Sequence, residues 1–450
     1  EVTLHVLALD GGSVEVAWDR DALPYLATGA WASADRLLLG VQSRDQRTFV
    51  VLEADPVTGD TAPVSTDVDE SWVELVPGSP AVLDDGRLVV AADREGRRCL
   101  VVDGIVATPP EVQVRSISHV GTGITFLGNP LGDATVMHVY HWDGVDVTQL
   151  TTEPGVHGVS DGLPLLTRRA SLDAPGGRWS WSSGRSLASH AETPLVEPRV
   201  TLHEFGDERI ATAVLLPRDH DGSKLPVLLD PYGGPHAQRG VQSYNALTSS
   251  QWVADQGFAV VVADGRGTPG RGTAWERAVP RDLATAVLDD QVTALQAAAH
   301  EHPELDLTRV AIRGWSFGGY LAALAVLLRP DVFHAAVAGA PVTEWRLYDT
   351  HYTERYLGDP TVDAAPYAAT SLLPLAPRPT RPLLLVHGLA DDNVVAAHSL
   401  QLSSALLAAG KPHELLPLVG VPHMTPQEVV AENLLLHQLD FLRRSLPPGS

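Results

Sequence analysis

The chain has 450 residues and a mass of 48.0 kDa, which is enough for two domains that each bury a sizeable core. Hydrophobic residues make up 44% and charged residues 19%, which excludes a disordered chain, and no apolar run approaches the roughly 18 residues of a membrane helix. The formal net charge of -23 argues against a nucleic-acid partner, because phosphate would be repelled.

The single cysteine, Cys99, excludes an internal disulfide framework and is compatible with a reducing compartment. It lies next to the apolar run 100–102, which favours a packed strand thiol over a reactive one. No signal-peptide pattern opens the sequence, so we expect a cytoplasmic protein with no membrane partner. No metal-ligand spacing is present, and we expect neither a metal nor a cofactor.

Residues 1–190 contain short β-strand patterns that are separated by Gly, Asp and Pro. Apolar runs at 37–39, 88–90 and 124–126 each follow a turn with Asp or Gly, and they recur at intervals of roughly 40 residues. This period is close to that of a propeller blade, so we predict a partial β-propeller of about four blades.

A linker rich in Ser, Pro and Glu (183–198) precedes a second domain over residues 191–450. Strand and helix patterns alternate there, which predicts a doubly wound, mostly parallel sheet covered on both faces. Strands are expected over 201–204, 210–216, 227–229, 259–263, 310–313, 335–338, 383–386 and 414–419, and helices over 244–255, 283–299, 317–328, 396–409 and 426–445. The last helix is expected to have Thr425 as its N-cap and Pro426 at its first position.

The segment 310–328 predicts a nucleophile elbow. The apolar residues 310–312 are followed by Gly314-Trp315-Ser316-Phe317-Gly318 and then by an apolar helical run. A strand, a sharp turn with Gly-x-Ser-x-Gly and a helix together are typical of an α/β-hydrolase. We therefore expect an α/β-hydrolase domain with Ser316 as its nucleophile; the alternative is a glycine-rich turn with an incidental serine.

A serine nucleophile needs a base and an orienting carboxylate, which follow it in this order in the chain: Ser, Asp or Glu, His. The acid is expected in the loop after strand 383–386, where Asp391 and Asp392 are equal candidates by chemistry alone. His423, after strand 414–419, combines the right order with the right edge of the sheet. His387 is expected to be a structural hydrogen-bonding group instead.

Two donors are expected for an oxyanion hole. One is the backbone N–H of Phe317, which follows the nucleophile. The other is the hydroxyl of Tyr232 in the loop after strand 227–229; the alternative is a tyrosine packed in a Gly-Pro turn.

Together these residues resemble the prolyl oligopeptidase family of serine peptidases, in its dipeptidyl peptidase IV branch. The resemblance is carried by motifs spread over the second half of the chain, which are Leu229-Asp230-Pro231-Tyr232-Gly233-Gly234-Pro235, Asp264-Gly265-Arg266-Gly267, Gly314 to Tyr320, Ala340 to Trp345 with Tyr348 to Tyr356, His387 to Val394, and His423.

The resemblance implies that Asp391 is the acid beside Ser316 and His423, that Tyr232 is the side-chain oxyanion donor, and that Asn393 holds a substrate carbonyl. It also implies a flat apolar pocket for proline or alanine, lined by Val342, Trp345, Tyr348, Tyr352 and Val394. Family members of this branch anchor the free substrate amine on adjacent glutamates in the first half of the propeller. This chain is expected to begin after that point, and no substitute glutamate pair is visible.

The main hypothesis is thus a serine peptidase that cleaves after proline or alanine through an acyl-enzyme and acts on peptide substrates. One alternative is an aminoacyl peptidase or an esterase with relaxed specificity, and another is a non-catalytic binding or scaffold protein. The resemblance further implies a homodimer formed through the final helix and the propeller edge.

Overall fold

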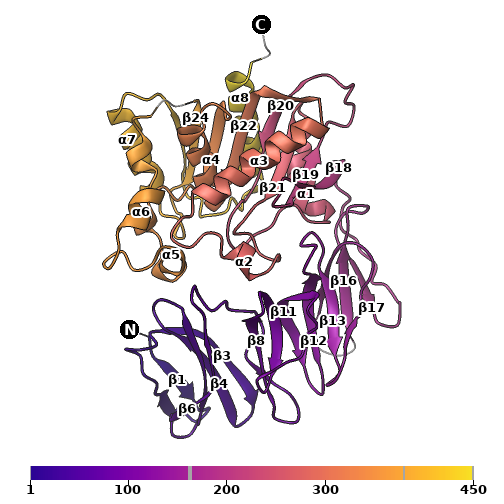
Figure 1. The fold of residues 1–450 in the computed structure, drawn as a ribbon, viewed down its shortest axis with the longest axis vertical. Helices are drawn as coiled ribbons and strands as arrows, with labels where there is room; N and C mark the ends of the chain where they lie inside the picture. The colour runs from indigo at the N-terminus through magenta and orange to yellow at the C-terminus, as the bar shows by residue number, and fades with distance from the viewer. Residues whose placement is uncertain (1, 161–164, 379–380, 448–450) are drawn as a thin grey trace. The chain divides into compact units, whose positions relative to one another are not determined.

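A computed structural model describes residues 2–160, 165–378 and 381–447 and divides the chain into two compact units (Figure 1). The first comprises Glu1–Ser171, Gly177–His190 and Gly270–Ala274, and the second comprises Leu172–Gly176, Ala191–Pro269 and Trp275–Ser450. The first unit therefore includes a short stretch that comes from the middle of the chain. There Asn129 Nδ2 donates a 2.8 Å hydrogen bond to Gly270 O, and Thr273 N donates a 3.0 Å hydrogen bond to Gly96 O.

The first unit consists of antiparallel sheets, as the regular spacing of apolar runs predicted. Among the described residues of this unit, three sheets have four strands, one has three and one has two. In chain order the sheets are β1 (Leu4–Leu7) and β2 (Ser13–Val16); β3 (Tyr25–Ser33), β4 (Arg36–Gln42), β5 (Thr48–Ala54) and β6 (Thr61–Val68); β7 (Ala81–Val82), β8 (Leu88–Arg94), β9 (Arg97–Val102) and β10 (Ile105–Val106); β11 (Val112–Val120), β12 (Ile124–Pro130), β13 (His138–Trp142) and β14 (Val147–Gln149); and β15 (Val156–Val159), β16 (Leu166–Ala170) and β17 (Arg178–Trp181). The expectation of propeller-like β-sheets is confirmed, and the short β1–β2 hairpin was missed because it lies outside the period.

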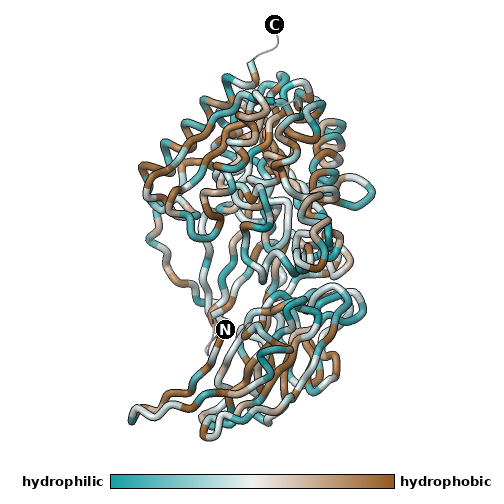
Figure 2. The backbone as a smooth tube through the Cα atoms, turned by 90° about the vertical axis from the view of Figure 1, so that its left-hand side faces the viewer, coloured by the Kyte–Doolittle hydropathy of each residue, from teal (hydrophilic) through white to brown (hydrophobic). Residues whose placement is uncertain are grey.

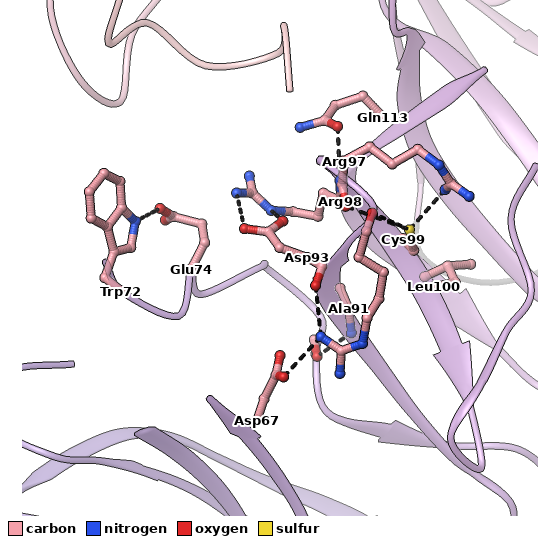
Figure 3. Close-up of polar contacts among 12 residues, drawn as sticks. Asp67, Trp72, Glu74, Ala91, Asp93, Arg97, Arg98, Cys99, Leu100 and Gln113 are labelled. Atoms are coloured by element: carbon pink, nitrogen blue, oxygen red, sulfur yellow. Dashed lines mark hydrogen bonds and ion pairs between the residues drawn. The ribbon is translucent and has the colours of Figure 1, made fainter. Parts of the chain in front are cut away.

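Cys99 lies in β9 within a set of polar contacts (Figure 3). Its Sγ is 2.8 Å from Arg97 Nη1, and the neighbouring Arg98 pairs with Asp93 at 3.0 Å. The side chain of Cys99 is fully buried, and burial raises the pKa of its thiol. Cys99 is therefore a packed strand residue rather than a nucleophile.

The second unit is built on one eight-stranded sheet in the order β18-β19-β21-β20-β22-β23-β24-β25. Strands β20 to β25 pair in parallel with their neighbours, whereas β18 and β19 extend the sheet antiparallel at one edge. Their bounds are β18 (Val200–Phe205), β19 (Ile210–Leu215), β20 (Leu225–Leu229), β21 (Ala259–Asp264), β22 (Leu305–Trp315), β23 (Ala335–Gly339), β24 (Leu383–Gly388) and β25 (Glu414–Leu418). The predicted mostly parallel sheet is confirmed.

Helices lie on both faces of this sheet. Helices α3 and α4 lie together in front of the strands in Figure 1, while α1 and α8 share one hydrophobic cluster with residues of the sheet. The bounds are α1 (Tyr244–Ala254), α2 (Thr273–Glu276), α3 (Thr285–Glu301), α4 (Phe317–Leu328), α5 (Thr350–Leu357), α6 (Ala365–Thr370), α7 (Ala397–Ala408), α8 (Glu428–Ser445), and the 3₁₀ turns η1 (Trp345–Leu347) and η2 (Leu373–Leu375). This two-sided cover explains why the parallel strands β21, β23 and β24 are buried along their whole length.

Each unit has its own hydrophobic interior. Hydrophobic stretches are distributed along the chain in both units (Figure 2), and the buried residues form separate clusters within each. The cluster between the sheet and helices α1 and α8 includes Leu228, Val260 and Phe441. The second unit thus has a core that can hold its loops in fixed positions.

The predicted start of the last helix is wrong. Gln427 is the N-cap residue, with extended backbone (φ -83, ψ 119), and α8 begins at Glu428 rather than at Pro426. The preceding segment is tied to the sheet edge, because Trp315 Nε1 donates to His423 O at 2.7 Å. The loop before α8 is thus held by a tertiary contact that the local capping pattern does not include.

Candidate active site

The candidate residues follow parallel strands at the carboxyl edge of the sheet. Tyr232 follows β20, Ser316 follows β22, Asp391 follows β24 and His423 follows β25. Strand β20 pairs with β21 on one side and β22 on the other, so the chain order reverses between β20 and β22. Ligands of open α/β sheets bind at such a switch point, which lies between the loops of Tyr232 and Ser316.

Ser316 lies in a sharp turn between β22 and α4. Its φ of 60° and ψ of -118° are unusual for a residue with a side chain. Only glycine fits on either side, because a Cβ at Gly314 would lie 2.2 Å from Gly318 O, and one at Gly318 would lie 2.8 Å from Pro231 O. The turn is fixed by Ser316 N, which donates to Gly339 O at 2.9 Å. The local geometry is that of a nucleophile elbow.

Asp391 and His423 form a hydrogen-bonded pair. His423 Nδ1 lies 2.8 Å from Asp391 Oδ2, and the other carboxylate oxygen accepts the backbone N–H groups of Asn393 (3.0 Å) and Val394 (2.8 Å). The Asp391 side chain is completely buried, whereas Asp392 is exposed. A carboxylate held in this way orients the imidazole, so the geometry favours Asp391 over Asp392 as the acid.

The loop that carries His423 is attached to the residue before the nucleophile. Trp315 Nε1 donates to the carbonyl oxygen of His423 at 2.7 Å. Ser316 is half-buried, and its Oγ has no hydrogen-bond partner among the described residues, His423 included. The elbow and the histidine loop are therefore joined through Trp315, while the hydroxyl and the imidazole are not hydrogen-bonded in this structure. Such bonds are often long in unliganded sites.

Tyr232 supplies a hydroxyl beside the elbow. Its ring centroid lies 5.9 Å from that of Phe317, and its hydroxyl makes no hydrogen bond to any described residue. Burial, followed by the neighbouring Tyr348, raises the pKa of Tyr232 to about 12, so its hydroxyl stays protonated as a donor. Phe317 is the first residue of α4, where backbone N–H groups have no acceptor within the helix. Both proposed oxyanion donors are thus available.

Aromatic side chains line the segment after β23. Trp345 and Tyr352 stack in parallel with centroids 6.0 Å apart and an angle of 9°, and Tyr348 stands edge-on to both. Val342 and Val394 are buried beside this group, and Tyr348 donates its hydroxyl to Asn393 Oδ1 at 3.0 Å. These faces suit a flat apolar ring.

His398 fixes the segment that begins this aromatic group. Its Nδ1 accepts the backbone N–H of Thr343 at 3.2 Å, and its carbonyl oxygen accepts the Thr343 hydroxyl at 2.7 Å. Burial lowers the pKa of His398 to about 4, so the ring is neutral and can accept. His387 is also buried; it contacts Ser399 Oγ and Val394 O, each at 2.7 Å, and burial lowers its pKa. Both histidines therefore have positioning contacts.

Sequence reasoning missed two members of the aromatic group. Tyr356 packs edge-on to Tyr352 at 5.1 Å, and its hydroxyl lies 2.9 Å from His236 Nε2. The spacing of Tyr348, Tyr352 and Tyr356 at four-residue intervals was a usable signal for Tyr356, because such residues share one helix face. His236 had no local signal, since it comes from the loop after β20.

A buried ionic network lies beside the site, where Arg313 of β22 meets the loop after β20. Asp230, at the end of β20, pairs with Arg313 Nη2 at 2.8 Å and with Arg239 Nη1 at 2.7 Å. Burial would raise the pKa of Asp230, and the two guanidinium groups more than offset this and lower it. Among the described residues no group of three or more His, Cys, Asp or Glu side chains could hold a metal ion. No described helix has the length and hydrophobicity required to cross a membrane.

The fold and the site define an α/β-hydrolase domain with a nucleophile elbow, preceded by propeller-like β-sheets. Residues 244–448 match the Prolyl oligopeptidase family, and residues 1–103 match the Dipeptidyl peptidase IV (DPP IV) N-terminal region. The region over residues 244–448 is thus a domain of the prolyl oligopeptidase type.

Curated relatives match about half of the chain. Dipeptidyl peptidase 8 of Mus musculus and that of Homo sapiens are each 40% identical over 244 residues, which are 52% of this chain and 27% of the relative. Dipeptidyl peptidase family member 2 of Caenorhabditis elegans is 38% identical over 192 residues, 42% of this chain and 23% of the relative. The matched region thus spans about a quarter of the length of these relatives.

Two solved structures share the fold of almost the whole chain. The Porphyromonas gingivalis dipeptidyl peptidase 4 has a TM-score of 0.87 and 23% identity, covering 99% of this chain and 67% of that one. A putative dipeptidyl aminopeptidase IV from Bacteroides ovatus has a TM-score of 0.84 and 22% identity, covering 97% of this chain and 68% of that one. At these identities the likeness concerns the fold alone.

Proposed function

We propose that this protein is a serine peptidase of the dipeptidyl-peptidase type that cleaves after proline or alanine. Ser316 Oγ attacks the substrate carbonyl while His423 takes its proton, and His423 then gives this proton to the leaving amine as the C–N bond breaks. Water, activated by His423, hydrolyses the resulting acyl-enzyme and frees Ser316. Asp391 orients and stabilises the imidazole, and the Tyr232 hydroxyl and Phe317 N–H stabilise the oxyanion. The observation that carries the proposal is the 2.8 Å contact of His423 with buried Asp391, on a loop tied to the residue before Ser316.

The proposed acyl pocket is the aromatic group of Val342, Trp345, Tyr348, Tyr352 and Val394, with Asn393 holding a substrate carbonyl. A proline ring is rigid and apolar, so stacking it on these faces requires little ordering. Asn393 is exposed, and its Oδ1 is held by Tyr348, which leaves its amide N–H₂ as the donor to a carbonyl.

The test is hydrolysis of Gly-Pro-p-nitroanilide, compared with the same compound acetylated at its amine. A dipeptidyl peptidase cleaves the free-amine compound with the larger kcat/KM. Equal cleavage of both forms would support an aminoacyl peptidase or esterase instead. Labelling with a fluorophosphonate tests the non-catalytic alternative. Folded wild-type protein is expected to react with the reagent, and Ser316→Ala is expected not to react. Absence of labelling in folded wild-type protein would contradict the catalytic proposal.

The proposal extends to assembly and compartment. Val429 and Leu436 are exposed apolar residues on α8, which supports a homodimer through this helix. The single cysteine is free and buried, which supports a reducing compartment such as the cytoplasm. Sedimentation of wild type and Leu436→Lys tests the dimer, which the lysine is expected to weaken.

A further inference from the structure

The second unit contains a cavity behind the nucleophile turn that shares no residue with the proposed catalytic or substrate-binding set. It has a volume of about 410 Å³ and is lined by Asp230, Arg239, Ser249, Arg313, Gly314, Trp315, Val337, Met424, Thr425, Ala431, Leu434, Leu435 and Gln438. It therefore lies between the end of β22, the segment after His423 and the first half of α8. This volume is within the range of sites for small molecules.

Most of the wall is apolar. Val337 and Leu434 are buried members of the sheet–helix core, and Ala431, Leu435 and Trp315 continue this surface. Such a wall fits a short hydrocarbon body.

Two buried polar side chains leave hydrogen-bonding groups without a partner at this cavity. Arg313 is 7% exposed and uses Nε and Nη2 for Asp230 and Ser249, while its Nη1 has no partner among the described residues. Gln438 is 8% exposed, and its side-chain amide has no hydrogen bond to any described residue. Both side chains line the cavity, and their unpartnered atoms are open to solvent rather than sealed inside the protein. Unpartnered N–H donors on two otherwise buried side chains of the wall match a carboxylate.

The cavity also contacts the site through Trp315. This residue forms part of the wall, and its Nε1–H holds the carbonyl oxygen of His423 at 2.7 Å. Met424 and Thr425, which follow the histidine directly, line the cavity as well. A molecule in the cavity would therefore press on the residues that position His423.

We propose that this cavity binds a small amphipathic carboxylate, with its apolar body against α8 and its carboxylate on Arg313 Nη1 and Gln438, and that occupancy changes turnover through Trp315 and His423. Binding itself does not depend on the proposed peptidase activity. The effect on turnover does, and it should appear in kcat rather than in KM, because the cavity lies outside the acyl pocket.

Isothermal titration calorimetry with octanoate, octanol and acetate tests the binding. Octanoate is expected to bind saturably with one site, octanol roughly tenfold to a hundredfold more weakly because it lacks the charge-assisted bonds, and acetate not measurably. Equal affinity for octanoate and octanol would overturn the carboxylate contact, and absence of saturable octanoate binding would overturn the site.

Two variants locate the site. Gln438→Leu removes the amide at nearly constant volume and is expected to weaken octanoate about tenfold without weakening octanol. Ala431→Phe fills the cavity and is expected to abolish octanoate binding, whereas Glu432→Phe, next to it on the same helix but not in the wall, is the matched control. Unchanged octanoate affinity in a folded Ala431→Phe protein would overturn this location.

The last measurement is turnover of Gly-Pro-p-nitroanilide with saturating octanoate. A change in kcat is expected in the wild type and in Glu432→Phe, and none in Ala431→Phe. Octanoate binding with unchanged kcat would overturn the coupling. Should the protein lack peptidase activity altogether, the proposed function fails, while the calorimetry still decides whether the cavity is a carboxylate site.

Discussion

The catalytic edge and the ionic network beside it use polar groups in opposite ways. At the edge, the Ser316 and Tyr232 hydroxyls are without partners among the described residues, and His423 has one carboxylate contact. In the network, by contrast, the carboxylate of Asp230 is paired with two guanidinium groups and buried. Groups kept free for substrate contribute to turnover, whereas paired buried charges are needed for the stability of the strands that hold them.

The largest expected effect is on turnover at the edge. Ser316→Ala is expected to lower kcat/KM for Gly-Pro-p-nitroanilide by roughly 10,000-fold or more, because it removes the attacking atom. Its melting temperature should stay close to that of the wild type, since the hydroxyl makes no internal hydrogen bond. Ser404→Ala, at an exposed position of α7, is the control and should retain full activity. Appreciable peptidase activity in Ser316→Ala would remove this residue from its role.

Substitutions in the ionic network are expected to change the stability of the protein. Asp230→Ala leaves the buried Arg313 and the part-buried Arg239 without their shared carboxylate and is expected to lower the free energy of unfolding by about 3–5 kcal/mol. In contrast, Asp440→Ala breaks the exposed pair with Arg444, whose side chains are 67% and 50% exposed, and should cost less than about 1 kcal/mol. Urea denaturation of both variants measures this difference, and equal losses would show that burial of the pair does not matter.

Tyr232→Phe tests whether the free hydroxyl at the catalytic edge contributes to turnover rather than to stability. Losing one oxyanion donor is expected to lower kcat by roughly 100- to 1,000-fold. Stability should hardly change, because the hydroxyl has no partner in the folded protein. Tyr25→Phe in β3 provides a comparison for removal of a tyrosine hydroxyl from the first unit. A loss in KM with normal kcat would instead indicate that Tyr232 serves in ground-state binding.

The smallest expected effect is a loss of stability at acid pH that depends on His398. Folding lowers the pKa of this histidine from 6.5 to about 4, so between these values the unfolded chain binds a proton that the folded chain does not. Above pH 6.5 the neutral His398 ring therefore adds up to about 3 kcal/mol to the free energy of unfolding. This contribution is lost as the pH falls from 6.5 through about 4. His398→Asn keeps an acceptor for Thr343 N–H but cannot titrate. Urea denaturation at pH 7.5 and pH 4.5 should therefore show a smaller loss for this variant, and identical losses would contradict the assignment.

Local patterns predicted much of the second unit. The strands and main helices were found to within a few residues because apolar periodicity and Gly-x-Ser-x-Gly are local signals. The start of α8 was missed by two residues, because the local capping signal at Thr425 and Pro426 is not used in the fold. Helix α5 was missed as well, since its tyrosines face a group assembled from other loops.

The sequence by itself determined the order of the elements, the elbow around Ser316 and the candidate acid and base, because each depends on neighbouring residues or on chain order. It left Asp391 and Asp392 chemically equal, and only the fold placed one beside His423 and the other in solvent. Only tertiary structure joined Trp315 to the histidine loop and opened the cavity lined by Arg313 and Gln438. These contacts connect residues far apart in the chain, and their distances are set by how the sheet and helices pack rather than by any local pattern.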